Sequence, residues 1–201
     1  MLSLFEKLPG DVRRHSVRVA GYAERIYGWA LDYGVYPNDV SIRKNLRSKV
    51  HTLALWHDIG KLMVPREILD KPGKLTETEY REMQKHVEYA KVLYSRGNWP
   101  EEIGEEDRKA AMDVSYYHHE RWDGGGYLCG YRGEEIPAIA RICAIADAFD
   151  AIMSPRPYKK AVPAEKAVME IQANAGTQFD PLLVEIAVAG FQGTEGAGIK
   201  E

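Results

Sequence analysis

Residues 137–153, PAIARICAIADAFDAIM, are apolar on nearly every face of the helix that they predict. A helix that is apolar all round is buried in a globular protein, so other elements must surround it. The rest of the chain shows helical periodicity, without alternating β-branched runs or hairpin dipeptides between such runs. The sequence therefore predicts an all-α fold, a bundle of about seven helices packed around this segment.

Six further segments complete the predicted bundle. They span residues 11–31, 41–57, 76–95, 105–119, 163–174 and 180–190. Asp11 is the expected N-cap of the first, and Thr76 with Glu79 forms a capping box that opens the third. Prolines and a Pro-Gly-Lys turn predict a loop over 64–75. We predict a single domain over residues 1–191 and a disordered tail over 192–201.

Composition excludes several classes of protein. A net charge of -3 gives no basic footprint for long nucleic acid. Cys129 and Cys143 are too few, and too far apart, for a zinc knuckle or a disulfide framework, which predicts a reducing compartment. No apolar run approaches the roughly 18–20 residues that span a bilayer, and the N-terminus does not resemble a signal peptide. We therefore expect a cytoplasmic protein without a membrane partner.

The segment HDIGK, from His57 to Lys61, follows the apolar helical run TLALW. Adjacent His57 and Asp58 offer an imidazole nitrogen and carboxylate oxygens, which are ligands of Zn, Mn or Fe. A carboxylate can bridge two metals, and two metals about 3.5–4 Å apart clamp a phosphoester for hydrolysis. Lys61 follows Asp58 by three residues, close enough on a helix surface to contact a phosphate oxygen. Alone, the dipeptide is equally typical of a capped helix end with a surface lysine.

Further histidines strengthen the metal interpretation. Five of the six histidines lie at predicted helix positions, and His118-His119 forms a second adjacent pair. His51 is left out, because it falls on a different helix face from His57. A single helix histidine is often solvated, and a pair at a helix end interacts with the helix dipole. Two pairs plus two single histidines fit that explanation poorly, and ligands without thiolates favour Fe, Mn or Zn in a hydrolytic site.

Asp147 and Asp150 interrupt the apolar helix over 137–153. An unpaired buried carboxylate is costly, so each of them needs a metal, a base or a helix cap. Glycines 124–126 allow a loop to approach a ligand closely. Arg156 and Lys159 belong to a basic patch that is either a solvated turn or the anion-binding rim of the site.

Several motifs occur in one order along the chain. They are HDIGK, VPREILDKPGKLTETE, KH at 85–86, HHERWDGGGYL, GEEIPAIARICAIADAFDAI, RPYKKA and GTQFDP. Over residues 10–191 this order resembles the HD-GYP family, a branch of the HD phosphohydrolase superfamily. The resemblance implies an HD-domain helical bundle with a metal site in its centre. It also implies hydrolysis of cyclic di-GMP to the linear dinucleotide or to GMP.

The resemblance further implies two divalent metal ions, with Fe or Mn expected first and Zn, Ni or Mg as alternatives. The family's ligand positions correspond to His15, His57, Asp58, His86, His118, His119 and Asp147. Asp58 would be the bridging carboxylate, and hydroxide activated by the two metals would attack the phosphodiester. Some members hold a third metal through a Glu one turn before the first His. Asp11 occupies that position and is one methylene shorter, which leaves a third metal open.

By the same resemblance Lys61 is a catalytic residue that contacts the phosphate. Arg156 and Lys159 match basic residues that meet phosphate or guanine, while Gly126 and Tyr127 belong to the substrate loop. Tyr127 either stacks on a base or packs in the core. The chain departs from the family pattern in having Leu128 where the family has Pro. Proline is not a metal ligand, so the change bears on loop rigidity and substrate positioning.

Two other functions fit the same residues. One is an HD hydrolase of another cyclic dinucleotide or nucleotide, and the other is a catalytically inactive, ligand-binding signalling domain. Family members usually carry a receiver or other sensory domain, so we expect either an excised domain or a stand-alone enzyme under partner control. The expected partners are the cyclic dinucleotide itself, regulatory or diguanylate cyclase proteins, and a second copy in a homodimer.

Overall fold

The computed structural model describes residues 1–96, 99–155 and 161–195. Within these ranges the elements are helices and loops, apart from one isolated bridge between Ala175 and Phe179. The longer helices are α2 (Gly10–Tyr33), α5 (Glu77–Gln84), α6 (His86–Arg96), α7 (Glu105–Tyr117), α8 (Ala138–Met153), α9 (Ala164–Ala173) and α10 (Pro181–Glu195). The shorter ones are α1 (Leu2–Phe5), α3 (Val50–Leu55), α4 (Arg66–Leu69) and the 3-10 turns η1 (Lys44–Leu46), η2 (Ile59–Met63) and η3 (Gly133–Glu135). The all-α prediction is confirmed.

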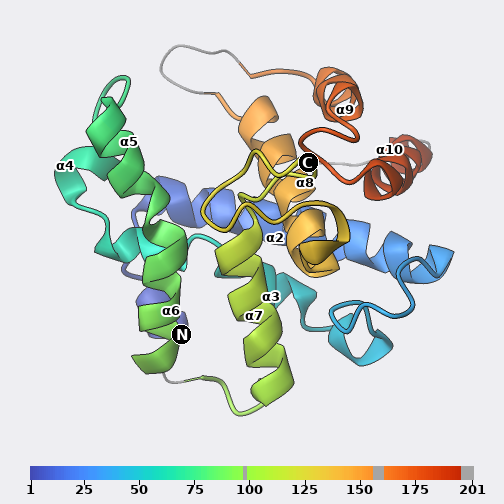
Figure 1. Cartoon of the computed structure of the whole chain (residues 1–201), viewed down its shortest axis with the longest axis horizontal. Helices are drawn as coiled ribbons and strands as arrows, with labels where there is room; N and C mark the ends of the chain where they lie inside the picture. The colour runs from blue at the N-terminus through green and yellow to red at the C-terminus, as the bar shows by residue number, and fades with distance from the viewer. Residues whose placement is uncertain (97–98, 156–160, 196–201) are drawn as a thin grey trace.

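Helix α8 lies in the core of the bundle, as its apolar sequence requires. Ile142, Ile145 and most of its other residues are fully buried. It packs against α2, α7 and α9, while α2 also contacts α3 and α10. In Figure 1, α6 and α7 stand side by side and α2 passes behind them. None of the helices in the described ranges is long and apolar enough to cross a membrane.

The predicted helix over 41–57 is too long, because α3 covers only Val50–Leu55. Two side chains of the preceding segment form hydrogen bonds with α8 instead. Asp39 accepts one from the Ala138 N–H (2.9 Å), and Ser41 accepts one from the Ile139 N–H (3.0 Å). These bonds satisfy N–H groups at the start of α8 that lack partners within the helix. The segment near residue 41 is therefore held in a loop and not in a helix.

The other helix boundaries need smaller corrections. The predicted helix over 76–95 divides at Lys85 into α5 and α6, and the predicted loop over 64–75 contains α4. Pro9, not Asp11, occupies the N-cap of α2, and no side chain caps that end. Helix α10 continues to Glu195, so residues 192–195 are helical and not part of a tail.

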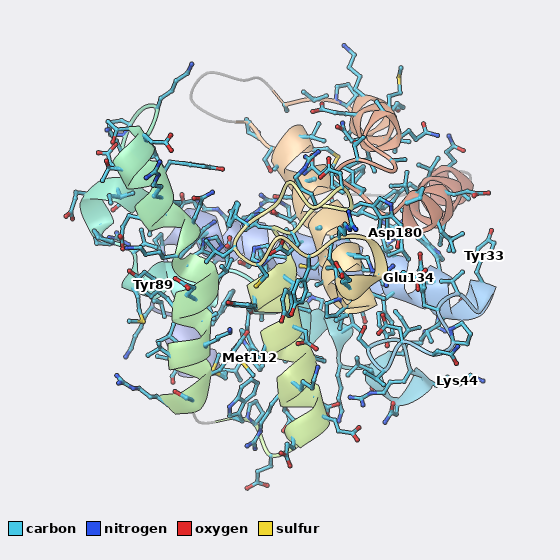
Figure 2. All side chains as sticks on the ribbon, viewed as in Figure 1. Tyr33, Lys44, Tyr89, Met112, Glu134 and Asp180 are labelled. Carbon is cyan, nitrogen blue, oxygen red and sulfur yellow. The ribbon has the colours of Figure 1, made fainter. Side chains whose placement is uncertain are left out.

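The predicted capping box is confirmed. Thr76 and Glu79 form a reciprocal capping box at the start of α5. Asp180 accepts hydrogen bonds from the Leu182 and Leu183 N–H groups, and its other oxygen pairs with Arg141 of α8. Figure 2 shows Asp180 between α8 and α10, where it fastens the last helix to the core.

Candidate metal centre

The turn that carries His57 and Asp58 begins where α3 ends. The Trp56 carbonyl accepts hydrogen bonds from the Ser115 hydroxyl (3.0 Å) and the Tyr94 hydroxyl (3.3 Å). The same carbonyl accepts a hydrogen bond from the Ile59 N–H (3.0 Å), so it joins the turn itself to two other helices. Because Ser115 lies on α7 and Tyr94 on α6, the turn is fixed relative to both helices.

Gly60 lets the turn approach α6 closely. A Cβ at this position would lie 1.8 Å from the His86 carbonyl oxygen and 2.8 Å from the Ala90 nitrogen, so only glycine fits. Helix α6 packs directly on η2 as a result, and His86 is brought to Asp58. Gly60 of the HDIGK segment therefore allows α6 to bring His86 close to Asp58.

Asp58 lies at the centre of two groups of side chains. Its Oδ1 lies 3.3 Å from Nε2 of His86 and 3.9 Å from Nε2 of His118. Its Oδ2 lies 3.3 Å from Nε2 of His57 and 3.9 Å from Nε2 of His15. His119 completes the first group, and within each group the ligand-type atoms lie within 4.8 Å of one another. One carboxylate thus presents one oxygen to each histidine group.

The buried imidazoles have a defined tautomer. Nδ1 of His57 lies 3.0 Å from the Ala54 carbonyl, and Nδ1 of His86 lies 2.8 Å from the Met83 carbonyl. Nδ1 of His118 faces two carbonyls of α7 in the same way. A carbonyl only accepts, so each Nδ1 carries the proton and each Nε2 has a lone pair directed at Asp58.

This arrangement fits divalent metal ions. Nε2 of His57, His86 and His118 and Oδ1 of Asp58 are buried without a hydrogen-bond partner among the described residues. Buried polar atoms are ordinarily paired, and four such atoms directed at one space require a common partner. Lone pairs on neutral imidazoles and a carboxylate suit a metal cation, with backbone carbonyls holding the far side of each ring.

The pKa values of three histidines and of Asp58 agree with these protonation states. Burial lowers the pKa of His118 well below its ordinary value and that of His86 to a smaller extent, while burial and the nearby His86 bring the pKa of His119 to about 3. Burial alone would raise the pKa of Asp58, but Lys61 and His57 hold it well below its usual range. The imidazoles of His86, His118 and His119 are therefore neutral at neutral pH, and the carboxylate of Asp58 is ionised.

His15 and Asp147 close the other side of the cluster. Nε2 of His15 lies 3.0 Å from Oδ1 of Asp147 and 3.9 Å from Oδ2 of Asp58, so His15 of α2 lies between an aspartate of α8 and the oxygen of Asp58 that faces His57. Burial lowers the pKa of His15, yet hydrogen bonds to Asp147 and Asp150 outweigh it and raise the pKa to about 9. Asp147 is held ionised, because contacts with His15 and His57 lower its pKa despite burial.

A cavity of about 610 Å³ adjoins the cluster. His118, His119 and Asp147 form its floor, and Gly126 and Tyr127 border it. A Cβ on Gly126 would lie 2.5 Å from the Glu120 Cα, so the loop packs closely on the segment that follows His119. The Tyr127 ring stacks on the His119 ring with centroids 4.9 Å apart. The peptide bond between Tyr127 and Leu128 is cis.

One wall of the cavity is a shelf of small side chains on α8. We call Ala144, Ala148 and Ala151 the alanine shelf; with Asp147 they line the cavity from α8. None of these side chains extends beyond Cβ, so the wall is flat and apolar. Tyr80 lines the cavity as well, and Glu170, Asn174 and Gln178 border it with polar groups.

Some predicted residues lie elsewhere. Asp11 belongs to neither histidine group; it lines a separate hollow of about 490 Å³ with Arg14 and Arg18. Arg156 and Lys159 lie outside the residues that the structure describes. The sequence places His51 outside the predicted site, and in the structure His51 belongs to neither histidine group.

Asp150 and Tyr80 were not predicted as site residues. Asp150 contacts Nδ1 of His15 at 2.7 Å; its place in an apolar helix indicated that it needs a partner, but not which one. Tyr80 lies on α5 with an exposed side chain and lines the cavity, and nothing in the sequence around it indicates that position.

Comparison with known proteins agrees with this geometry. The HD domain family model matches residues 12–183. The 3'3'-cGAMP-specific phosphodiesterase 2 of Vibrio cholerae serotype O1 is 38% identical over 172 residues, which are 86% of this chain and 30% of that protein. The cyclic di-GMP phosphodiesterase of Thermotoga maritima is 36% identical over 185 residues, which are 92% of this chain and 45% of that protein. The chain therefore spans less than half the length of these relatives.

A solved structure, "Bd1817, a HDG"Y"P protein from Bdellovibrio bacteriovorus", has the same fold. The match has a TM-score of 0.58 and 16% identity, and it covers 90% of this chain and 52% of that one. The chain belongs to the HD domain family.

Proposed function

We propose that this protein is a metal-dependent phosphodiesterase that hydrolyses a cyclic dinucleotide, with cyclic di-GMP as its substrate. The observation that carries the proposal is the position of Asp58, whose two oxygens face two separate histidine groups. A carboxylate in this position suits a pair of divalent ions, the arrangement that supports in-line displacement at phosphorus. The named activities of the relatives support the same reaction class.

The proposed ligands divide between two ions. His15, His57, Asp58 and Asp147 would hold one, and Asp58, His86, His118 and His119 the other. Imidazole and carboxylate ligands without thiolates favour Fe, Mn or Zn, and the resemblance puts Fe or Mn first. When bound, such ions supply Lewis acidity and a water nucleophile at neutral pH. Asp11 lies outside both groups, so we propose two ions and not three.

Lys61 would neutralise the phosphate. Its Nζ lies 2.5 Å from Oδ2 of Asp58, at the edge of the cluster, where an ammonium can follow charge that develops on a phosphate oxygen. Its role requires no proton transfer, because the ammonium acts through its charge. A phosphodiester above Asp147 and His119 would lie within the reach of this side chain.

The cavity suits the rest of a cyclic dinucleotide. Its volume of about 610 Å³ is in the range of small-molecule sites. A purine can lie flat on the alanine shelf, and Tyr127 or Tyr80 can stack on a second base. The shelf offers no group that distinguishes guanine from adenine, so 3'3'-cGAMP is the alternative substrate, as the Vibrio relative suggests.

The test is hydrolysis by protein reconstituted anaerobically with Fe(II) or Mn(II). Cyclic di-GMP, 3'3'-cGAMP and cyclic di-AMP are compared, and Asp58→Ala serves as the control. We expect metal-dependent cleavage of cyclic di-GMP by the wild type and none by the variant. Preferential cleavage of 3'3'-cGAMP would change the substrate but keep the reaction class. Tight binding of a dinucleotide by metal-loaded protein without cleavage would show a sensor and overturn the proposal.

A further inference from the structure

His15 differs from the other histidines of the cluster in what holds its ring. Nδ1 of His57, His86 and His118 faces a backbone carbonyl within the preceding turn. Nδ1 of His15 instead lies 2.7 Å from Oδ2 of Asp150, a residue 135 positions away on α8. The orientation of His15 therefore depends on a side chain, and through it on the packing of α2 against α8.

Asp150 is itself fixed by two further groups. Nε of Arg18 donates to its Oδ1 at 2.6 Å, and Nη2 of Arg18 donates to its Oδ2 at 3.0 Å. The Ser154 hydroxyl lies 3.2 Å from Oδ2 and also accepts from Arg18 at 3.0 Å. The carboxylate is only 1% exposed, so these bonds are shielded from water on one side. A bidentate arginine holds a carboxylate in one orientation.

Asp150 belongs to neither group of ligand-type atoms around Asp58. Arg18 and His15 already occupy both of its oxygens. Asp147, one turn earlier on α8, faces Nε2 of His15 instead. The two aspartates thus contact the two nitrogens of one ring from the same helix, one toward the cluster and one away from it.

We propose that Asp150, held by Arg18, is the positioning residue of His15. It keeps the Nδ1 proton on the far side of the ring, so that the Nε2 lone pair faces the ion shared with His57 and Asp147. Carboxylates in this role typically change metal affinity about 10–100-fold when they are removed. The inference rests on the proposed function, because it assumes a metal at that position. It adds that one of the two ions depends on an ion pair that reaches the surface, where Arg18 is 44% exposed.

The test measures metal binding and not turnover. Chelator-stripped wild type, Asp150→Asn and Arg18→Gln are titrated with Mn(II), and free Mn(II) is followed by electron paramagnetic resonance. We expect wild type to bind two ions. Asp150→Asn should bind one ion as wild type does and the other about 10–100-fold more weakly. Arg18→Gln, a change at an exposed side chain that should leave folding intact, should weaken the same ion by a smaller factor.

Asp180→Asn is the matched control. Asp180 is equally buried on the opposite side of α8 and is also paired with an arginine, Arg141, but it contacts no histidine of the cluster. This variant should lose thermal stability and keep both ions at wild-type affinity. If Asp150→Asn and Arg18→Gln both bind two ions as wild type does, the inference is wrong and the proposed function stands. If wild type binds no ion, both are overturned.

Discussion

The ammonium of Lys61 lies 2.5 Å from Oδ2 of Asp58, the same carboxylate oxygen that faces His57 at 3.3 Å and His15 at 3.9 Å. A metal cation bound by that oxygen would have to share it with the ammonium. In the proposed site Lys61 would therefore weaken binding of the ion on its own side of the cluster, while it supplies positive charge for the substrate.

Replacing Lys61 with methionine separates these two effects. We expect Lys61→Met to bind the ion beside His15 and His57 more tightly, and to turn over cyclic di-GMP about a hundredfold more slowly, because a fixed charge near the phosphate is lost. Mn(II) titration and single-turnover kinetics check both parts. Lys71→Met is the control, since Lys71 pairs with Glu79 away from the cluster. Reduced metal affinity in Lys61→Met would contradict the prediction.

Gly60 should be intolerant of any side chain. The Cβ of Gly60→Ala would meet backbone atoms of α6, which must shift and take His86 with them. Overpacking typically costs about 1–3 kcal/mol, and backbone that cannot yield costs more. We expect a lower midpoint of denaturant unfolding together with loss of metal. Gly73→Ala has open space around its Cβ and should behave as wild type. Equal stability of the two variants would refute the packing argument.

The raised pKa of His15 predicts a pH dependence of stability in EDTA-treated protein. The folded-state pKa is about 9 against 6.5 for an unperturbed imidazole, so the protonated ring stabilises the fold. This contribution is complete below pH 6.5 and is lost as the pH rises through about 9. The difference in melting temperature between wild type and His15→Gln should therefore narrow from pH 6 to pH 9.5. A difference that is constant across this range would mean that the pKa of His15 is not raised.

The alanine shelf can be tested with substrates of two sizes. In Ala148→Phe the ring would occupy the flat wall of the cavity, and kcat/KM for cyclic di-GMP should fall by about tenfold or more. Hydrolysis of bis(4-nitrophenyl) phosphate, which needs little of the shelf, should change far less. Ala173→Phe, on an exposed part of α9 outside the cavity lining, is the control. Equal losses of activity with both substrates would show that no purine base of the dinucleotide lies on the alanine shelf.

The sequence was most informative where neighbours along the chain act together. The pairs His57-Asp58 and His118-His119 lie beside each other, and the structure brings both pairs to one point. The capping box at Thr76 is equally local and is confirmed. The bonds of Asp39 and Ser41 to α8 could not be predicted, because about 100 residues separate their partners. A separation of 135 residues likewise concealed the contact of Asp150 with His15, since no pattern within either helix specifies the other.

The cluster takes its side chains from distant parts of the chain. Asp58, His86, His118 and His119 all precede residue 120, whereas Asp147 and Asp150, which complete the surroundings of His15, lie on α8. Chains are synthesised from the N-terminus, so a growing polypeptide holds every histidine of the cluster before the two aspartates that contact His15 are made. A product truncated before α8 would lack these partners of His15, and the hydrolysis proposed above would then require a chain whose synthesis has passed that helix.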